Sequence, residues 1–242
     1  MLRIINSFLL CSSYEQARFS HINTLQEMFP GIVKMEAIFP KYQNVPFLQK
    51  LINLSEQRTG IKLMPGEIGC LLGHRKIWKT ILNSKDEYEG HYLVLESDSK
   101  INDIDLLKNS FHKYSAPYDI FFWGAWEGDM RIKKSTIIFN EHNRVIGEPL
   151  LNSIYCTYGY SLNKAAAGYL LNQTNKISFP VDFFKKFIQP NTLRIGGIRN
   201  ELISICSEFK SSIRTPSMGS RLKHFLMLLI LNVKNKVQAY FS

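Results

Sequence analysis

Residues 92–98 read YLVLESD, an apolar run that ends in two carboxylates, Glu96 and Asp98. Alternation along an extended chain puts residues i and i+2 on the same side, so both carboxylates can face one cavity where the strand ends. Two hard oxygen ligands in this arrangement suit Mg²⁺ or Mn²⁺ that carries a phosphorylated substrate. The pattern therefore predicts an enzyme that uses a nucleotide.

A second segment, residues 65–74, reads PGEIGCLLGH and begins a predicted helix that runs to about residue 83. A proline and an acidic residue in the first turn favour this helix start. Gly69 and Gly73 lie four residues apart, so we expect another element to pack closely against them. Glu67 and His74 are two turns apart and fall on the same side of the helix.

Strand and helix patterns alternate along the chain. Strands are expected at 2–10, 32–39, 91–95 and 118–124, helices at 14–28, 65–83, 103–114 and 163–172, a loop with a short helix at 40–64, a hairpin at 136–146 and a turn at 196–197. This alternation predicts an α/β fold with a largely parallel central sheet flanked by helices. Ligands in such sheets bind at the carboxyl ends of the strands, where the two carboxylates lie.

The composition fits one large domain, expected at residues 1–215, followed by a basic and apolar C-terminal helical segment at 216–242. A net charge of +10 favours an anionic partner. No zinc-finger spacing or RNA-reading aromatic motif accompanies this charge, so no nucleic-acid partner is expected. The four cysteines show no C-x-x-C spacing and are expected to be reduced thiols. Residues 1–11 are expected to form a core strand and not an export signal.

Several blocks of the chain resemble glycosyltransferase family 25, which comprises bacterial lipopolysaccharide and lipooligosaccharide glycosyltransferases and the collagen galactosyltransferases. Members carry a G-E-I-G-C-x-x-S-H segment and then a strand that ends in E-D-D. Here Gly73 replaces the Ser of the first motif, and Ser97 replaces the middle Asp of the second. Matching blocks at 118–124, 157–162 and 180–182 follow in the family's order, so the resemblance covers about residues 2–185.

The resemblance implies a GT-A type fold and an inverting transfer of a hexose, with galactose favoured. The implied donor is a nucleotide sugar such as a UDP-hexose, and the implied acceptor is a saccharide of lipopolysaccharide, lipooligosaccharide or a related surface glycan. It implies Mn²⁺ or Mg²⁺ at Asp98 and Glu96, with metal dependence left open by Ser97, because a hydroxyl is a poorer ligand than a carboxylate. It also assigns Asn6, Glu67 and His74 to donor and substrate binding.

An inverting transfer needs a base that takes the proton of the acceptor hydroxyl. Asp182 is the first candidate, although it can also cap a helix that starts after it. Glu127 and Asp129 compete for the same role. Trp123 and Trp126 either stack on sugar faces or belong to the core.

The C-terminal segment contains an apolar run at 225–231 with cationic residues on both sides. The run is too short to span a bilayer, but it can lie in the interface of an anionic membrane, or dock as a last helix on the core. The expected location is therefore cytoplasmic, peripheral on the inner face of the membrane. Two other functions remain open: a degenerate, non-catalytic saccharide-binding relative, and a basic module that binds membranes.

Overall fold

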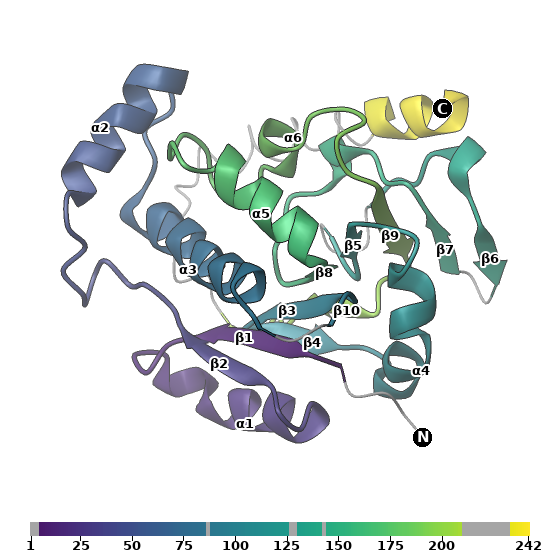
Figure 1. Cartoon of the computed structure of the whole chain (residues 1–242), viewed down its shortest axis with the longest axis horizontal. Coiled ribbons are helices and arrows are strands. Elements are labelled where there is room, and N and C mark those ends of the chain that lie inside the picture. The colour runs from purple at the N-terminus through teal and green to yellow at the C-terminus, as the bar shows by residue number, and fades with distance from the viewer. Residues whose placement is uncertain (1–4, 86–87, 126–129, 142–143, 210–232) are drawn as a thin grey trace.

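The computed structural model describes residues 5–85, 88–125, 130–141, 144–209 and 233–242 (Figure 1). Its centre is an eight-stranded sheet in the order β2-β1-β3-β8-β5-β9-β7-β6. These strands are β1 Ser7–Cys11, β2 Val33–Glu36, β3 Tyr92–Glu96, β5 Ile120–Phe122, β6 Phe139–Glu141, β7 Arg144–Gly147, β8 Gly159–Leu162 and β9 Ile195–Arg199.

The sheet is mixed in its pairings, but most of its strands point the same way, in line with the expected largely parallel sheet. Strand β1 is parallel to both β2 and β3, and β5 is parallel to β9. Strand β8 runs antiparallel to β3 and β5, and β7 runs antiparallel to β9 and β6. All strands of the sheet except β8 and β7 thus point the same way. A separate antiparallel ribbon pairs β4 Ser99–Ile101 with β10 Ile203–Ile205, and two residues separate β4 from β3.

Helices cover both faces of the sheet (Figure 1). They are α1 Phe19–Met28, α2 Leu48–Thr59, α3 Pro65–Leu82, α4 Ile104–Ser115, α5 Lys164–Gln173 and α6 Phe184–Phe187, with the short 3-10 helices η1 Gln16–Arg18, η3 Lys134–Thr136 and η4 Leu151–Ser153. The predicted α/β class is confirmed. The region expected as a loop with a short helix contains the three-turn helix α2, and the two glycines expected in a turn lie inside β9.

Alternation along β3 explains how the sheet joins its two helical layers. Leu93 and Leu95 pack with α1 and α4 in one core cluster, whereas Tyr92 and Val94 pack with α3 and α5 in the other. The same alternation aims Glu96, the last residue of the strand, toward the α3 side. The strand therefore places its terminal carboxylate beneath α3 before the chain leaves the sheet.

Helix α3 lies unusually close to two neighbouring segments. A Cβ atom at Gly69 would stand 2.2 Å from the carbonyl oxygen of Ile38, and one at Gly73 would stand 2.9 Å from Cδ1 of Leu10. The expected close packing at these glycines is therefore confirmed. It holds the first half of α3 against the end of β1 and the chain that follows β2.

Residues 233–241 form a further helix at the C-terminus, with Asn235 and Ala239 buried. The run at 225–231 lies outside the described residues. Among the residues that are described, no helix is both long enough and apolar enough to cross a membrane.

Gly69→Ala should destabilise the protein by about 1–3 kcal/mol, because the new methyl group meets backbone that cannot rotate away. The control is Gly168→Ala in α5, where the added Cβ would meet Leu82 at an ordinary 3.4 Å. That variant should gain about 0.5–1 kcal/mol from helix propensity. Urea unfolding measures both, and equal stability of the two variants would contradict the close approach.

Candidate active site

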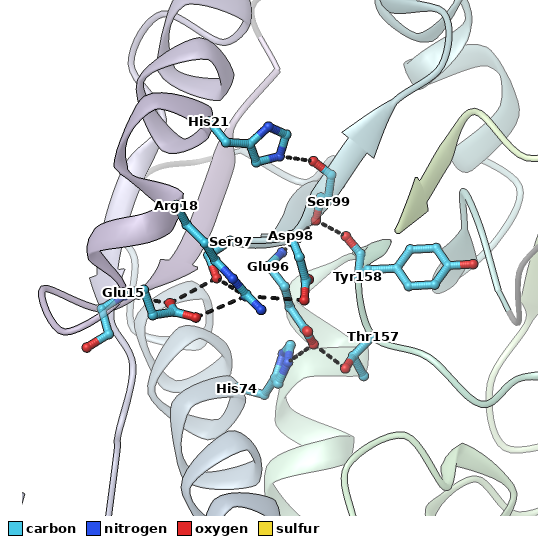
Figure 2. Close-up of polar contacts among 11 residues, drawn as sticks. Glu15, Arg18, His21, His74, Glu96, Ser97, Asp98, Ser99, Thr157 and Tyr158 are labelled. Atoms are coloured by element: carbon cyan, nitrogen blue, oxygen red, sulfur yellow. Dashed lines mark hydrogen bonds and ion pairs between the residues drawn. The ribbon is translucent and has the colours of Figure 1, made fainter. Parts of the chain in front are cut away.

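Glu96 lies at the carboxyl end of β3 and is held by one partner from α3 and one from the loop before β8 (Figure 2). Nε2 of His74 lies 3.0 Å from its Oε1, and the hydroxyl of Thr157 donates to the same oxygen. Burial by itself would raise the pKa of Glu96, but the hydrogen bonds from His74 and Thr157 and the nearby cationic charge outweigh it and lower the pKa. Glu96 is therefore a carboxylate at neutral pH, fixed in one orientation.

His74 lies on α3, as predicted, and is fully buried. Its Nδ1 lies 2.9 Å from the hydroxyl of Tyr160 on β8, which also accepts a hydrogen bond of 2.8 Å from Nε1 of Trp78. Both ring nitrogens of His74 are thus engaged by residues of different elements. The imidazole joins α3, β3 and β8 at one point.

Asp98 lies in the turn between β3 and β4, with its side chain mostly buried. Its Oδ2 is 3.2 Å from Nη1 of Arg18. Its Oδ1 is buried and has no hydrogen-bond partner among the residues that the structure describes. Burial, and then the negative charge of Glu96, raise the pKa of Asp98 to about 6, although Arg18 opposes this effect. One carboxylate oxygen is therefore held by Arg18, and the other has no hydrogen-bond partner in the described part of the chain.

Ser97 occupies the centre of a small charged network (Figure 2). Nη1 of Arg18 donates to its Oγ at 2.7 Å, and its hydroxyl donates to Oε2 of Glu15 at 2.9 Å. Glu15 and Arg18 also form an ion pair of 2.9 Å. The serine that replaces the motif's middle Asp thus contacts a carboxylate that comes from the segment after β1. Sequence reasoning missed Glu15, and only its position just after the first strand could have indicated it.

Cys70 lies one turn before His74 on α3 and is partly exposed. Burial raises the pKa of its thiol well above the usual value, and so do the negative charges of Glu96, Asp182, Asp98 and Glu67, in that order. The structure therefore gathers these four sequence-predicted carboxylates around one thiol. The motif contains this cysteine, but its nearness to Glu96, Asp98 and Asp182 depends on the folded chain.

Two of these carboxylates have defined local positions. Glu67 accepts a hydrogen bond of 2.9 Å from the backbone N–H of Met64 and so caps the start of α3. Asp182 lies in the turn before α6, where Phe183 and not Asp182 is the N-cap residue. The alternative role of Asp182 as that N-cap is therefore not realised.

The structure places two predicted site residues elsewhere. Asn6 precedes β1, and its backbone carbonyl accepts a hydrogen bond from the N–H of Leu93. This places Asn6 near the amino ends of β1 and β3, whereas Glu96 lies at the carboxyl end of β3. Trp123 is fully buried, with its Nε1 donating to Ser161 at 2.9 Å and its ring stacked on Phe111. Their assignment to substrate binding conflicts with these positions. Glu127, Asp129 and Trp126 lie outside the described residues.

An open hollow of about 510 Å³ lies at the other end of α3, lined by Met35, Lys76, Lys79, Thr80, Asn83 and Ser84. None of the gathered carboxylates lines it. We therefore assign the candidate site to the side-chain cluster at the end of β3 and not to this hollow.

In a comparison with known families, the model for glycosyltransferase family 25, described as lipopolysaccharide biosynthesis protein, matches residues 13–185. The chain belongs to glycosyltransferase family 25. The match contains α3, β3 and Asp182, so it covers the whole candidate site. With this membership, the mixed α/β architecture is that of a GT-A-like glycosyltransferase. A comparison with curated proteins finds no match.

The raised pKa of Asp98 predicts that the stability of the fold depends on pH. Between about pH 4 and pH 6 the folded chain binds more protons than the unfolded chain, so stability falls as pH rises through this window. In metal-free protein, Asp98→Asn should therefore raise the free energy of unfolding by about 1–3 kcal/mol at pH 7.5 and leave it unchanged at pH 4.

Urea unfolding at the two pH values in a chelator measures this difference. The control is Asp105→Asn, an exposed acid on α4 that should change stability equally little at both pH values. A loss of stability in Asp98→Asn at pH 7.5 would mean that the ion pair with Arg18 outweighs the burial of the charge.

Proposed function

We propose that the protein is an inverting hexosyltransferase, which moves galactose from UDP-galactose to a saccharide of lipopolysaccharide or a related surface glycan. The observation that carries this proposal is the contact between His74 and Glu96. It brings the family's two main motifs together at the carboxyl end of β3, where ligands of such sheets bind. Donor, sugar and acceptor are part of the proposal and rest on the family.

The end of β3 and the turn after it, residues Glu96 to Asp98, form an acidic turn that fits a divalent cation such as Mn²⁺ or Mg²⁺. Asp98 Oδ1 is buried and without a hydrogen-bond partner among the described residues, and Glu96 lies close enough to raise the pKa of Asp98. A bound cation would supply the charge that neutralises the leaving nucleoside diphosphate. Asp98 and Glu96 would hold it, and the hydroxyl of Ser97 is already engaged by Arg18 and Glu15.

The chain's own residues have separate roles in this proposal. Arg18 fixes Oδ2 of Asp98 and so orients the other oxygen, while His74 and Thr157 keep Glu96 ionised and in place. Asp182 is the proposed general base, because its charge acts on Cys70 together with those of Glu96 and Asp98. It would accept the proton of the acceptor hydroxyl as that oxygen attacks the anomeric carbon. Glu127 is the alternative base.

We further propose that the C-terminal helix docks on an anionic membrane, where a lipid-linked acceptor would be met on the cytoplasmic side. Residues 233–241 expose four apolar side chains at helical spacing, Val233, Val237, Tyr240 and Phe241. Exposed Lys234 and Lys236 lie on the same helix, and Nζ of Lys134 lies 4.3 Å from the ring of Tyr240. Apolar residues beside cationic ones suit the interface of an anionic bilayer.

Donor hydrolysis tests the transferase proposal. The purified protein, screened against a panel of nucleotide sugars with and without Mn²⁺, should slowly hydrolyse one donor. Asp98→Asn should reduce this rate about 100-fold or more, because the cation would lose its principal ligand. Asp105→Asn should leave the rate unchanged.

The same panel with an added saccharide acceptor tests the base. Asp182→Asn should lower transfer by about 100-fold. Full transfer by this variant would assign the role to Glu127. Nucleotide binding without turnover of any donor would contradict the proposal and favour a non-catalytic relative.

Co-sedimentation with anionic vesicles tests the membrane surface. The paired change of Val237 and Phe241 to Ser should weaken binding about tenfold or more, because both exposed apolar side chains leave the interface. The control is Phe47→Ser next to α2, an equally exposed aromatic at the far end of the molecule in Figure 1. Equal binding of both variants would contradict docking through the C-terminal helix.

A further inference from the structure

A thiol, an imidazole and a carboxylate meet between α3 and β3. Cys70 and His74 are four residues apart on α3, so their side chains lie on the same face one turn apart. Glu96 comes from the end of β3 (Figure 2). One ligand atom of each of the three residues lies within 4.8 Å of those of the other two.

Neighbouring groups already hold two of these side chains in place. The Tyr160 hydroxyl engages Nδ1 of His74, which leaves Nε2 on the side of Glu96, and Trp78 fixes that hydroxyl in turn. Thr157 holds Glu96. Metal-binding histidines usually have their second ring nitrogen engaged in this way, because the outer partner fixes the orientation of the ring.

The donor types select the metal. Mg²⁺ and Mn²⁺ prefer oxygen ligands, whereas a set of sulfur, imidazole nitrogen and carboxylate oxygen suits Zn²⁺. The negative charges of Glu67, Asp98 and Asp182 near Cys70 would also favour a cation at this point.

We propose that Cys70, His74 and Glu96 form a zinc site, with the fourth position left to water or a substrate oxygen. Binding forms one bond from each side chain to the metal, and the thiol proton of Cys70 passes to solvent. Occupancy would break the direct hydrogen bond between His74 and Glu96 and place the metal between them.

This site is distinct from the oxygen-ligand site proposed at Asp98, although the two share Glu96. Zinc would therefore compete with the donor-linked cation and inhibit transfer, a consequence that rests on the proposed function. The binding itself does not rest on it. A test by spectroscopy on the protein alone thus separates failure of the zinc site from failure of the transferase proposal.

Cobalt serves as the probe, because Co²⁺ occupies zinc sites and gives an absorption band when a thiolate ligates it. Metal-stripped full-length protein, titrated with Co²⁺, should show the thiolate band and intense visible bands, and one equivalent of Zn²⁺ should abolish them. Cys70→Ser should lose the thiolate band. Cys156→Ser, a matched change at another partly buried cysteine, should keep it.

Competition with a chromophoric chelator gives the affinity for zinc. Cys70→Ser and His74→Gln should each weaken it at least tenfold, and Tyr160→Phe should weaken it about tenfold while keeping the thiolate band. Circular dichroism confirms that each variant is folded. A Co²⁺ spectrum of the folded wild-type protein without a thiolate band would overturn the proposal, and so would unchanged zinc affinity in folded Cys70→Ser.

Discussion

The arrangement of the site depends on the contact between His74 and Glu96. The imidazole belongs to α3 and the carboxylate to the end of β3, and each is held again by a residue near or on β8. Because the carboxylate is buried, it requires these partners to remain charged. The contact therefore couples the packing of α3 on the sheet to the charge and direction of the acidic turn. The close approaches at Gly69 and Gly73 also support this contact, because they keep α3 near the ends of the strands.

Most polar side-chain atoms of the acidic turn are held by named partners, and one oxygen of Asp98 is not, within the described part of the chain. Arg18 and Glu15, from the segment after β1, engage Ser97 and one oxygen of Asp98, and the other oxygen of Asp98 is left without a hydrogen bond in the described structure. A buried carboxylate oxygen without a hydrogen bond lowers the stability of the fold, and proteins tolerate such a loss at functional sites. The hydroxyl of Ser97 connects a carboxylate from elsewhere in the chain to the same turn.

Local patterns were sufficient to predict much of this. The apolar run before Glu96 indicated a buried strand, and the spacing of Glu67 and His74 placed both on one face of α3, which the structure confirms. The motifs also indicated the family, which the match over residues 13–185 confirms. What local patterns could not provide is contact between distant segments. Glu15 contacts Ser97, which is 82 positions away in the chain, and Cys70 is brought next to Glu96 of another element. Trp123 is excluded from the site only by what packs around it.

The most direct test of this account is a crystal structure of the protein with Mn²⁺ and UDP, read from the anomalous signal of manganese. We expect a single strong peak beside Oδ1 of Asp98, with the diphosphate of the nucleotide on its far side and Glu96 still in contact with His74. A nucleotide bound at another edge of the sheet, or manganese bound away from the turn between β3 and β4, would contradict it.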